Sequence, residues 1–436
     1  MAGLLLTGGY AALFLYVIAR WRFFGVPGLR RRWIGGLFLL KVAMGTALWA
    51  VYTFHYTDRS TADIFKYFDD GNVLFSALPA HPEDFVRMLT GIGNDSPRFD
   101  EQYYMRMNNW YRRYDTGYYN DAHTMIRFSA VVRLFSLGVF HVHTVFAAFL
   151  SLVGLTALYK AFIGFVPGMG PALALGVFGW PSVLFWSSAP LKEAVLFLGL
   201  GLFVLSIFRR LEGPWRAADV ACMAVGVLTL ISLKSYVLAC LLPGMIALWW
   251  CRRTGGRRAV WKYVAVAVGV VAVVLTLPSV RPDLDVVALI HQKQRDMVGV
   301  ATSVDAGSFI PTAPMAPGLA GMLEQLPQAL SSAFLSPFSV WDQGIFGLLS
   351  GMENLVLLAL VPWALIWARP KARVDIPLLL FCLSFCLALA LLIGWTTPIV
   401  GALVRYRIPF LPCWSLAFLL VADPEKLKRL IPFPRR

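Results

Sequence analysis

The sequence predicts an all-α protein, a polytopic transmembrane helix bundle of about 11 spans with two long extracytoplasmic loops packed on its outer face. Of the 436 residues, 58% are hydrophobic and only 14% are charged, and mean hydropathy is +0.66. A soluble domain carries about 25% charged residues, so this composition argues against a water-soluble protein. Apolar stretches also run continuously for about 17–25 residues, which is typical of membrane helices and not of barrel strands.

Eleven apolar windows are expected to cross the membrane. In chain order they are residues 3–19, 33–54, 142–164, 171–188, 193–208, 217–233, 236–251, 260–277, 344–367, 375–394 and 406–422. The whole chain, 1–436, is expected to form a single integral membrane domain. Its long connections are residues 55–141, rich in Tyr, Asp, Arg and Asn, and residues 278–343, rich in Pro.

The formal net charge of +15 is explained by topology. When the spans alternate, one set of connections holds 22 of the 39 basic residues and only 5 of the 24 acidic ones. Loops of this kind stay in the cytoplasm, so the N-terminus is expected outside a bacterial inner (plasma) membrane and the C-terminus inside. Membrane lipid is therefore an expected partner, and nucleic acid is not.

Sequence motifs for common cofactors are missing. There is no P-loop, HExxH, GxSxG or dinucleotide-binding pattern. The six cysteines all lie within or at the ends of apolar stretches, where we expect small packing residues. No metal site is predicted, no cofactor is assigned, and a requirement for a divalent cation stays open.

The first candidate site follows the second span. If this segment is helical, Asp63, Tyr67 and Asp70 share one face at i, i+4 and i+7. Lys66 joins them at i+3, and Asp69 points elsewhere. A carboxylate at the membrane surface can act as a general base, and a neighbouring Lys or Tyr can tune its pKa.

Two further candidates lie at short outward connections. Lys192 and Glu193 follow a proline that interrupts an apolar run, and ionisable residues beside a span tend to be paired or functional. Lys234 stands between two spans with almost no loop to solvate it. A lone cation in such a place requires an anionic partner, from the protein or from a substrate.

Arginines near the last span form another candidate. Arg405 and Arg407 oppose the positive-inside trend, and arginine binds phosphate bidentately. Arg127 lies on an amphipathic stretch before the third span and is a further candidate binding residue.

Each candidate also has a structural interpretation. Ser60 or Thr61 would cap an ordinary helix start at the first candidate site. The charges at the short connections would snorkel to the interface or cap helices. The arginines beside the last span would anchor in an aromatic belt through a structural ion pair.

The layout resembles the GT-C glycosyltransferases, polytopic enzymes whose long first outer loop carries an essential Asp beside a span. Four local strings are also similar to those of uncharacterised Bacteroidetes-type membrane proteins of surface-polysaccharide synthesis: Asp63–Gly71, Thr124–Phe128, Pro181–Glu193 and Arg405–Pro409. One departure is the span 3–19, which precedes the usual arrangement of that family.

The resemblance implies inverting transfer of a sugar from a polyprenyl-phosphate donor to a glycan or lipid acceptor on the extracytoplasmic face. Asp63, or else Asp70 or Asp69, would deprotonate the acceptor hydroxyl. The cations that would neutralise the departing phosphate are Lys192, Lys234, Arg405 and Arg407. The further residues implied in binding are Lys66, Tyr67, Arg127 and Glu193.

Two other functions stay open. A polysaccharide (O-antigen) polymerase or ligase would depend on outer-loop residues, namely Arg281, His291, Arg295 and Arg405. A lipid-linked glycan flippase or transporter would use the same cationic lining without a base, and the sequence shows no inverted repeat of the kind that many transporters have.

Overall fold

A computed structural model describes residues 1–111, 119–303, 307–337, 344–370 and 374–430. Its secondary structure is helical, and the only β pairings among these residues are isolated bridges. The predicted all-α class is confirmed, and the chain is a polytopic helix bundle. Within the described ranges, nine helical segments are long and apolar enough to cross a membrane.

The nine segments correspond to most of the predicted spans. They are α1 (Ala2–Arg20), α2 (Arg31–Phe54), α7 (Phe140–Phe162, continued by a 3-10 turn to Phe165), α10 (Lys192–Glu212), α11 (Ala217–Arg253), α12 (Ala259–Val280), α16 (Gly344–Ile366), α17 (Ile376–Thr396), and α18 (Val400–Arg407) with α19 (Leu411–Val421).

The remaining predicted spans differ in form. Residues 171–188 make two short helices, α8 (Gly170–Phe178) and α9 (Pro181–Trp186), because Pro181 has no N–H and restricts the residue before it. Residues 217–251 lie in α11, where Lys234 has non-helical angles of φ −146° and ψ 73°. This break lies where the sequence divides two spans. The count of eleven and the sidedness of the loops stay predictions.

The chain divides into two compact units. One unit comprises Met1–Ala161 and Val183–Ser235, and the other comprises Phe162–Ser182 and Tyr236–Arg436. The predicted single membrane domain is not tested by this division. The two units are called unit 1 and unit 2 below, and each is described by itself.

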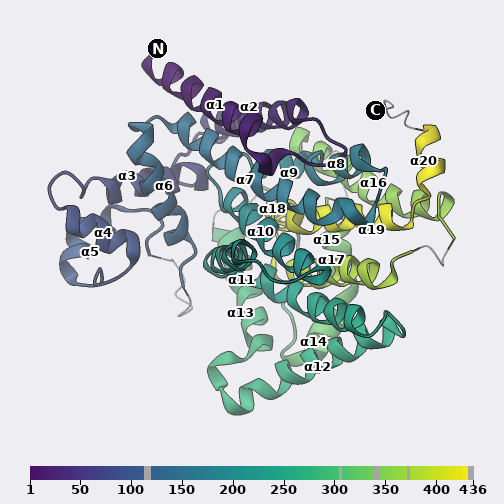
Figure 1. Cartoon of the computed structure of the whole chain (residues 1–436). Helices are drawn as coiled ribbons and strands as arrows, with labels where there is room; N and C mark the ends of the chain where they lie inside the picture. Colours follow the sequence, from purple (N-terminus) through teal and green to yellow (C-terminus); the bar gives the residue numbers. More distant parts are fainter. Residues whose placement is uncertain (112–118, 304–306, 338–343, 371–373, 431–436) are drawn as a thin grey trace. The chain divides into compact units, whose positions relative to one another are not determined.

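In unit 1, the first long connection is folded and packed. Its helices are α3 (Asp63–Phe75), α4 (Pro82–Thr90), α5 (Pro97–Gln102) and α6 (Ala122–Ser136), and α3 lies against α6 (Figure 1). Their apolar faces form one core with Leu48 of α2 and Leu191, which precedes α10. Trp110 stacks between Tyr104 and His123 in this core, with ring centroids 4.0 and 3.9 Å away. The segment is thereby fixed to the ends of the spanning helices.

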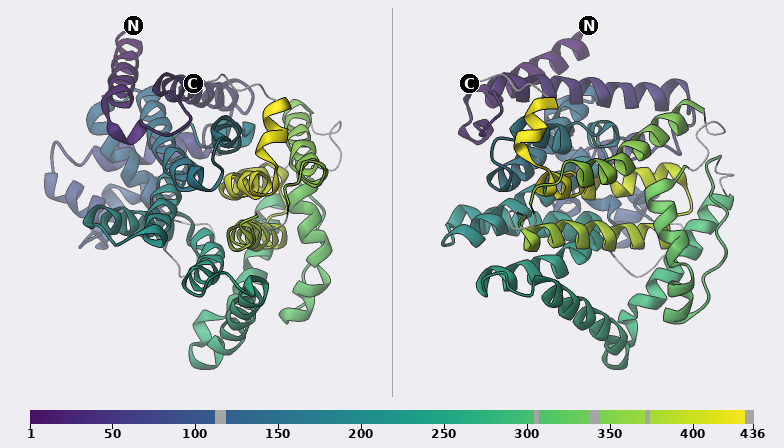
Figure 2. Two further views of the ribbon diagram at one scale, coloured as in Figure 1. Left: turned by 45° about the vertical axis from the view of Figure 1, so that its right-hand side comes forward. Right: turned by 90° about the vertical axis from the view of Figure 1, so that its right-hand side faces the viewer.

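Unit 2 is built around α17. The second long connection forms α13 (Val286–Ser303), α14 (Gly318–Glu324) and α15 (Leu326–Leu335), and the chain ends in α20 (Pro424–Leu430). Helix α17 packs on α15 and on α19. In Figure 2, α17 (yellow-green) and α19 (yellow) lie side by side. A Cβ on Gly394 would lie 2.1 Å from the carbonyl oxygen of Ala329, so α17 and α15 meet at backbone contact.

A similar close approach joins α7 and α10 in unit 1. A Cβ on Gly154 would lie 2.0 Å from the carbonyl oxygen of Phe197. A Cβ on Gly201 would lie 2.0 Å from the carbonyl oxygen of Gly154. Small residues of this kind allow membrane helices to pack at short separation.

We predict that Gly154→Val lowers the stability of the protein by about 1–3 kcal/mol, because the new side chain forces the two helices apart. Thermal unfolding in detergent measures the change. Gly9→Val is the matched control, since a Cβ there meets nothing within 4 Å. Equal melting temperatures for the two variants would contradict this close approach.

Candidate functional site

Helix α3 presents the predicted face. It begins at Asp63, and its buried side includes Tyr67 and Asp70, as the i, i+4, i+7 spacing predicts. Asp63 lies half-buried in the first helical turn, where the helix dipole stabilises a carboxylate. The capping predicted for Ser60 or Thr61 is wrong, because the N-cap is Ala62 and both hydroxyls donate to Asp58 instead.

Asp70 is fully buried and holds a loop. Its Oδ1 accepts hydrogen bonds from the backbone N–H (2.7 Å) and side-chain Nδ2 (3.1 Å) of Asn108. Its Oδ2 accepts from the backbone N–H of Asn109 at 2.8 Å. These bonds attach the segment before Trp110 to α3, so the structure gives Asp70 an architectural contact.

Asp69 points away from this face, as predicted. Its carboxylate receives two hydrogen bonds from the guanidinium of Arg59, at 2.9 and 2.6 Å. The same guanidinium lies 4.1 Å from the ring centroid of Phe65. Asp69 therefore fastens the turn before α3 at a partly exposed position.

Lys192 brings three helices together. It is the first residue of α10, and its Nζ lies 2.7 Å from Oδ2 of Asp121, the N-cap of α6. The same ammonium lies 5.6 Å from the ring centroid of Tyr67 on α3. Asp63 lies one helical turn before Tyr67 on the same helix.

The next residue, Glu193, forms a buried ion pair. Its Oε1 lies 2.7 Å from Nζ of Lys234, and the two side chains are 0% and 4% exposed. Lys234 stands at the break of α11, where its backbone angles are not helical. Thr124 of α6 donates to the carbonyl oxygen of Ser232 beside this break at 3.0 Å. The predicted anionic partner of Lys234 is thus a protein carboxylate.

Arg127 and Lys66 lie around this centre. Arg127 donates through Nε to the carbonyl oxygen of Met88 (2.9 Å) and through a terminal NH to the hydroxyl of Tyr119 (3.1 Å). It therefore fastens the end of α4 to α6. Lys66 is half-buried on α3. Hydrogen bonds from Ser60 are the main cause that lowers the pKa of Asp58, and the charge of Lys66 adds a smaller effect in the same direction.

Arg405 and Arg407 belong to unit 2. The guanidinium of Arg407 is 1% exposed and donates to Oε1 of Glu353 at 3.0 Å and to Oδ1 of Asn354. The second carboxylate oxygen of Glu353 accepts from the backbone N–H of Ser182 at 2.8 Å. Arg407 thus has the structural ion pair that the sequence left as its alternative. Arg405 is half-buried on the same helix.

Three polar residues with contacts in the structure were not predicted from the sequence. Asp121 precedes a helical stretch, a common N-cap signal. Glu353 and Lys41 each interrupt an apolar window, a signal for a paired or functional group. Lys41 is 1% exposed on α2, and its Nζ donates to the hydroxyl of Ser187 at 2.8 Å. That hydroxyl also accepts from Ser151 at 3.0 Å.

Over the described ranges, no three His, Cys, Asp or Glu side chains are gathered in a way that could hold a metal ion. Cys382 and Cys386 on α17 are buried free thiols, as is Cys413 on α19. The requirement for a divalent cation stays open.

No family model, no curated protein and no solved structure matches this chain.

We predict that Asp70→Ala lowers stability by about 2–4 kcal/mol, because it leaves the backbone N–H groups of Asn108 and Asn109 without their acceptor. Asp69→Ala removes a carboxylate from the same helix but breaks only an exposed ion pair, at a cost of about 1 kcal/mol or less. Thermal unfolding of both variants in detergent compares them. Equal losses would show that Asp70 does not hold the loop.

The stability of unit 1 should also depend on pH through Asp70. Burial is the largest effect on its pKa and raises it above 3.8, although the bonds from Asn108 and Asn109 act in the opposite direction. As pH rises past 3.8, the unfolded chain loses its proton first, so this contribution to stability decreases until the folded carboxyl also ionises. Melting temperatures measured against pH should show this decrease in the wild type and in Asp95→Asn. The decrease should be missing in Asp70→Asn, and its persistence there would contradict the assignment.

Proposed function

We propose that the chain is a GT-C-like glycosyltransferase that moves a sugar from a polyprenyl-phosphate donor to a glycan or lipid acceptor on the extracytoplasmic face of a bacterial inner membrane. One observation carries the proposal: the ammonium of Lys192 lies over the ring of Tyr67, one helical turn from the half-buried Asp63. A carboxylate and a cation on neighbouring turns of helices that leave the apolar spans suit transfer from a phosphate leaving group.

Asp63 is the residue best suited to act as the base. Asp70 is enclosed by three hydrogen bonds from Asn108 and Asn109. Asp69 is paired with Arg59 on another side of α3. Asp63 keeps partial exposure and shares its face with Tyr67.

The proposed step is a single displacement. Asp63 accepts the proton of the acceptor hydroxyl while that oxygen bonds to the anomeric carbon of the donor sugar. The bond from the anomeric carbon to the phosphate oxygen breaks, and polyprenyl phosphate departs with the electron pair. Lys192 stabilises the developing negative charge. An ammonium has three N–H donors, so Lys192 can contact the phosphate while it stays bonded to Asp121.

The pair of Glu193 and Lys234 would have a positioning role in this step. It fixes the first turn of α10 to α11, and Lys192 is the adjacent residue. Arg407 is left out of this mechanism, because Glu353 and Asn354 already hold its guanidinium in a buried position.

We predict that Asp63→Asn reduces sugar transfer by about 10²–10⁴-fold, since the amide cannot accept the proton. Lys192→Gln should reduce the rate by about 10²–10³-fold through lost stabilisation of the phosphate. The assay follows a radiolabelled sugar from polyprenyl phosphate into an acceptor-lipid extract, using purified full-length protein in vesicles.

Matched controls come from the same folded segment. Asp95 and Arg87 are exposed, and Asp95→Asn and Arg87→Gln should leave transfer within about twofold of the wild type. Full transfer by Asp63→Asn would overturn the choice of base. The protein is a transporter instead if the wild type binds the donor and moves labelled lipid across the vesicle membrane but forms no product.

A further inference from the structure

One side of α6 is apolar and uncovered over its last two turns. Val131, Leu134 and Phe135 stand on this side at i, i+3 and i+4, and all three are exposed. Leu137, in the turn that follows, is exposed as well. These four residues are called the α6 stripe below. The opposite side of the helix is buried and packs on α3.

The same side is polar at the start of the helix. Thr124 and Arg127 precede Val131 at helical spacing, and both donate to backbone carbonyl oxygens elsewhere in unit 1. Helix α6 therefore changes along its length. Its first half is fastened to other parts of the protein, and its second half presents apolar side chains outward. An exposed apolar patch of this kind marks a surface for a protein partner or for a membrane.

Contacts with two spanning helices give the level of this apolar half. The hydroxyl of Tyr10 on α1 donates to the carbonyl oxygen of Phe135 at 3.0 Å. The rings of Phe135 and Phe146 on α7 stack with their centroids 5.9 Å apart. Just after α6, Val139 lies 3.4 Å from the position that a Cβ on Gly3 would take. The end of α6 thus lies beside segments that are long and apolar enough to cross a membrane.

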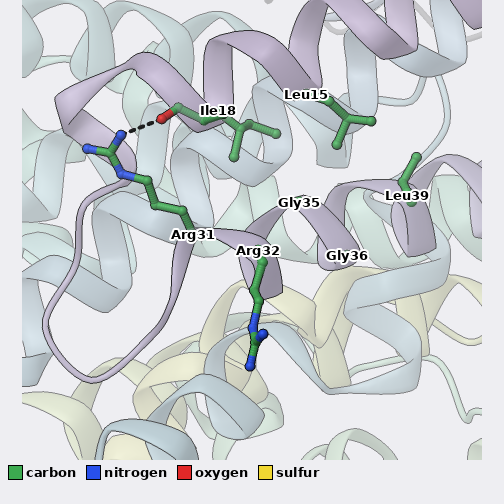
Figure 3. Close-up of a pocket in the computed structure, with 8 residues that line it drawn as sticks. Leu15, Ile18, Arg31, Arg32, Gly35, Gly36 and Leu39 are labelled. Atoms are coloured by element: carbon green, nitrogen blue, oxygen red, sulfur yellow. Dashed lines mark hydrogen bonds between the residues drawn. The ribbon is translucent and has the colours of Figure 1, made fainter. Parts of the chain in front are cut away.

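The far end of α1 marks the other membrane surface. Five arginines lie there and no Asp or Glu precedes Asp58, and Figure 3 shows Arg31 donating to the carbonyl oxygen of Ala19. Tyr10 lies nine residues before Ala19, about 14 Å along the helix. The hydrocarbon layer of a bilayer is about 30 Å thick. The end of α6 therefore meets α1 between Gly3 and Tyr10, in the half of that layer away from these arginines.

The charges of α6 agree with this level. The guanidinium of Arg133 lies 4.8 Å from the ring centroid of Phe75 on α3, beside the α6 stripe. Arginine can lay its apolar stem along such a surface while its charge stays at the headgroups. Helix α6 contains no Asp or Glu. Basic residues together with one apolar side are typical of helices that lie in a membrane surface.

We propose that the second half of α6 is inserted into the membrane surface, with the α6 stripe in contact with the acyl chains of one leaflet. The stripe adjoins α1, whose exposed residues include Leu4, Leu5 and Leu13. This continuity with a lipid-facing span favours lipid over a second copy of the chain as the partner. The proposal does not depend on glycosyl transfer.

Thiol accessibility tests the insertion. Leu137→Cys and Ile92→Cys place a thiol at positions of the first long connection that are 73% and 75% exposed, so the protein itself covers them equally. Full-length protein in phosphatidylcholine vesicles is treated with a charged, membrane-impermeant maleimide. Each site is followed by mass spectrometry of its own peptide, so the native cysteines do not interfere. We expect Leu137→Cys to react about tenfold more slowly or less, because hydrocarbon excludes a charged reagent.

A lipid probe identifies what covers the stripe. Phosphatidylcholine with a diazirine on its acyl chain is photolysed in vesicles that contain the wild type, and adducts should map to the α6 stripe and not to Ile92. After denaturation in SDS the two introduced thiols should react equally, so that the difference belongs to the folded, inserted protein. Equal maleimide rates in vesicles would overturn the proposal. So would protection of Leu137→Cys without a lipid adduct on the stripe, the result expected if a second copy covers α6.

Discussion

The buried ion pair between Glu193 and Lys234 is the constraint on which the centre of unit 1 depends. An isolated charge in an apolar interior is strongly unfavourable, so each of these side chains requires the other. The pair fixes the start of α10 against the break in α11. Thr124 binds the carbonyl oxygen of Ser232 beside that break, which adds α6 to the same junction.

The position of Lys192 follows from this junction. As the neighbour of Glu193, it emerges from the same first turn of α10 and reaches Asp121 on α6 and the ring of Tyr67 on α3. Polar side chains from separate segments of the chain are thus arranged by one buried contact. The site around Lys192 keeps its geometry because the helices that support it pack in an apolar core. Leu191 and Tyr67 belong to this core.

Local sequence patterns predicted the elements of this arrangement, and not its pairings. Helical spacing placed Tyr67 and Asp70 on the buried face of α3 and Asp69 off it, because that relation depends only on the 3.6-residue repeat. Hydropathy located the break at Lys234. Hydropathy wrongly predicted one continuous helix over residues 171–188, because a hydropathy average does not register the effect of Pro181 on the backbone. The partner of Lys192 lies 71 residues away and that of Ser182 lies 171 away, and such contacts depend on tertiary packing.

The absence of carboxylates before Asp58 also has an electrical consequence. Moving one elementary charge across a membrane potential of 100 mV requires about 2.3 kcal/mol of work. Five arginines lie at the adjoining ends of α1 and α2 and in the loop between them, namely Arg20, Arg22, Arg30, Arg31 and Arg32. Carrying them against that potential would require roughly 11.5 kcal/mol, before any cost of dehydration. The predicted cytoplasmic placement of this loop puts its arginines on the negative side of an energised membrane, where the potential opposes any reversal of the two helices.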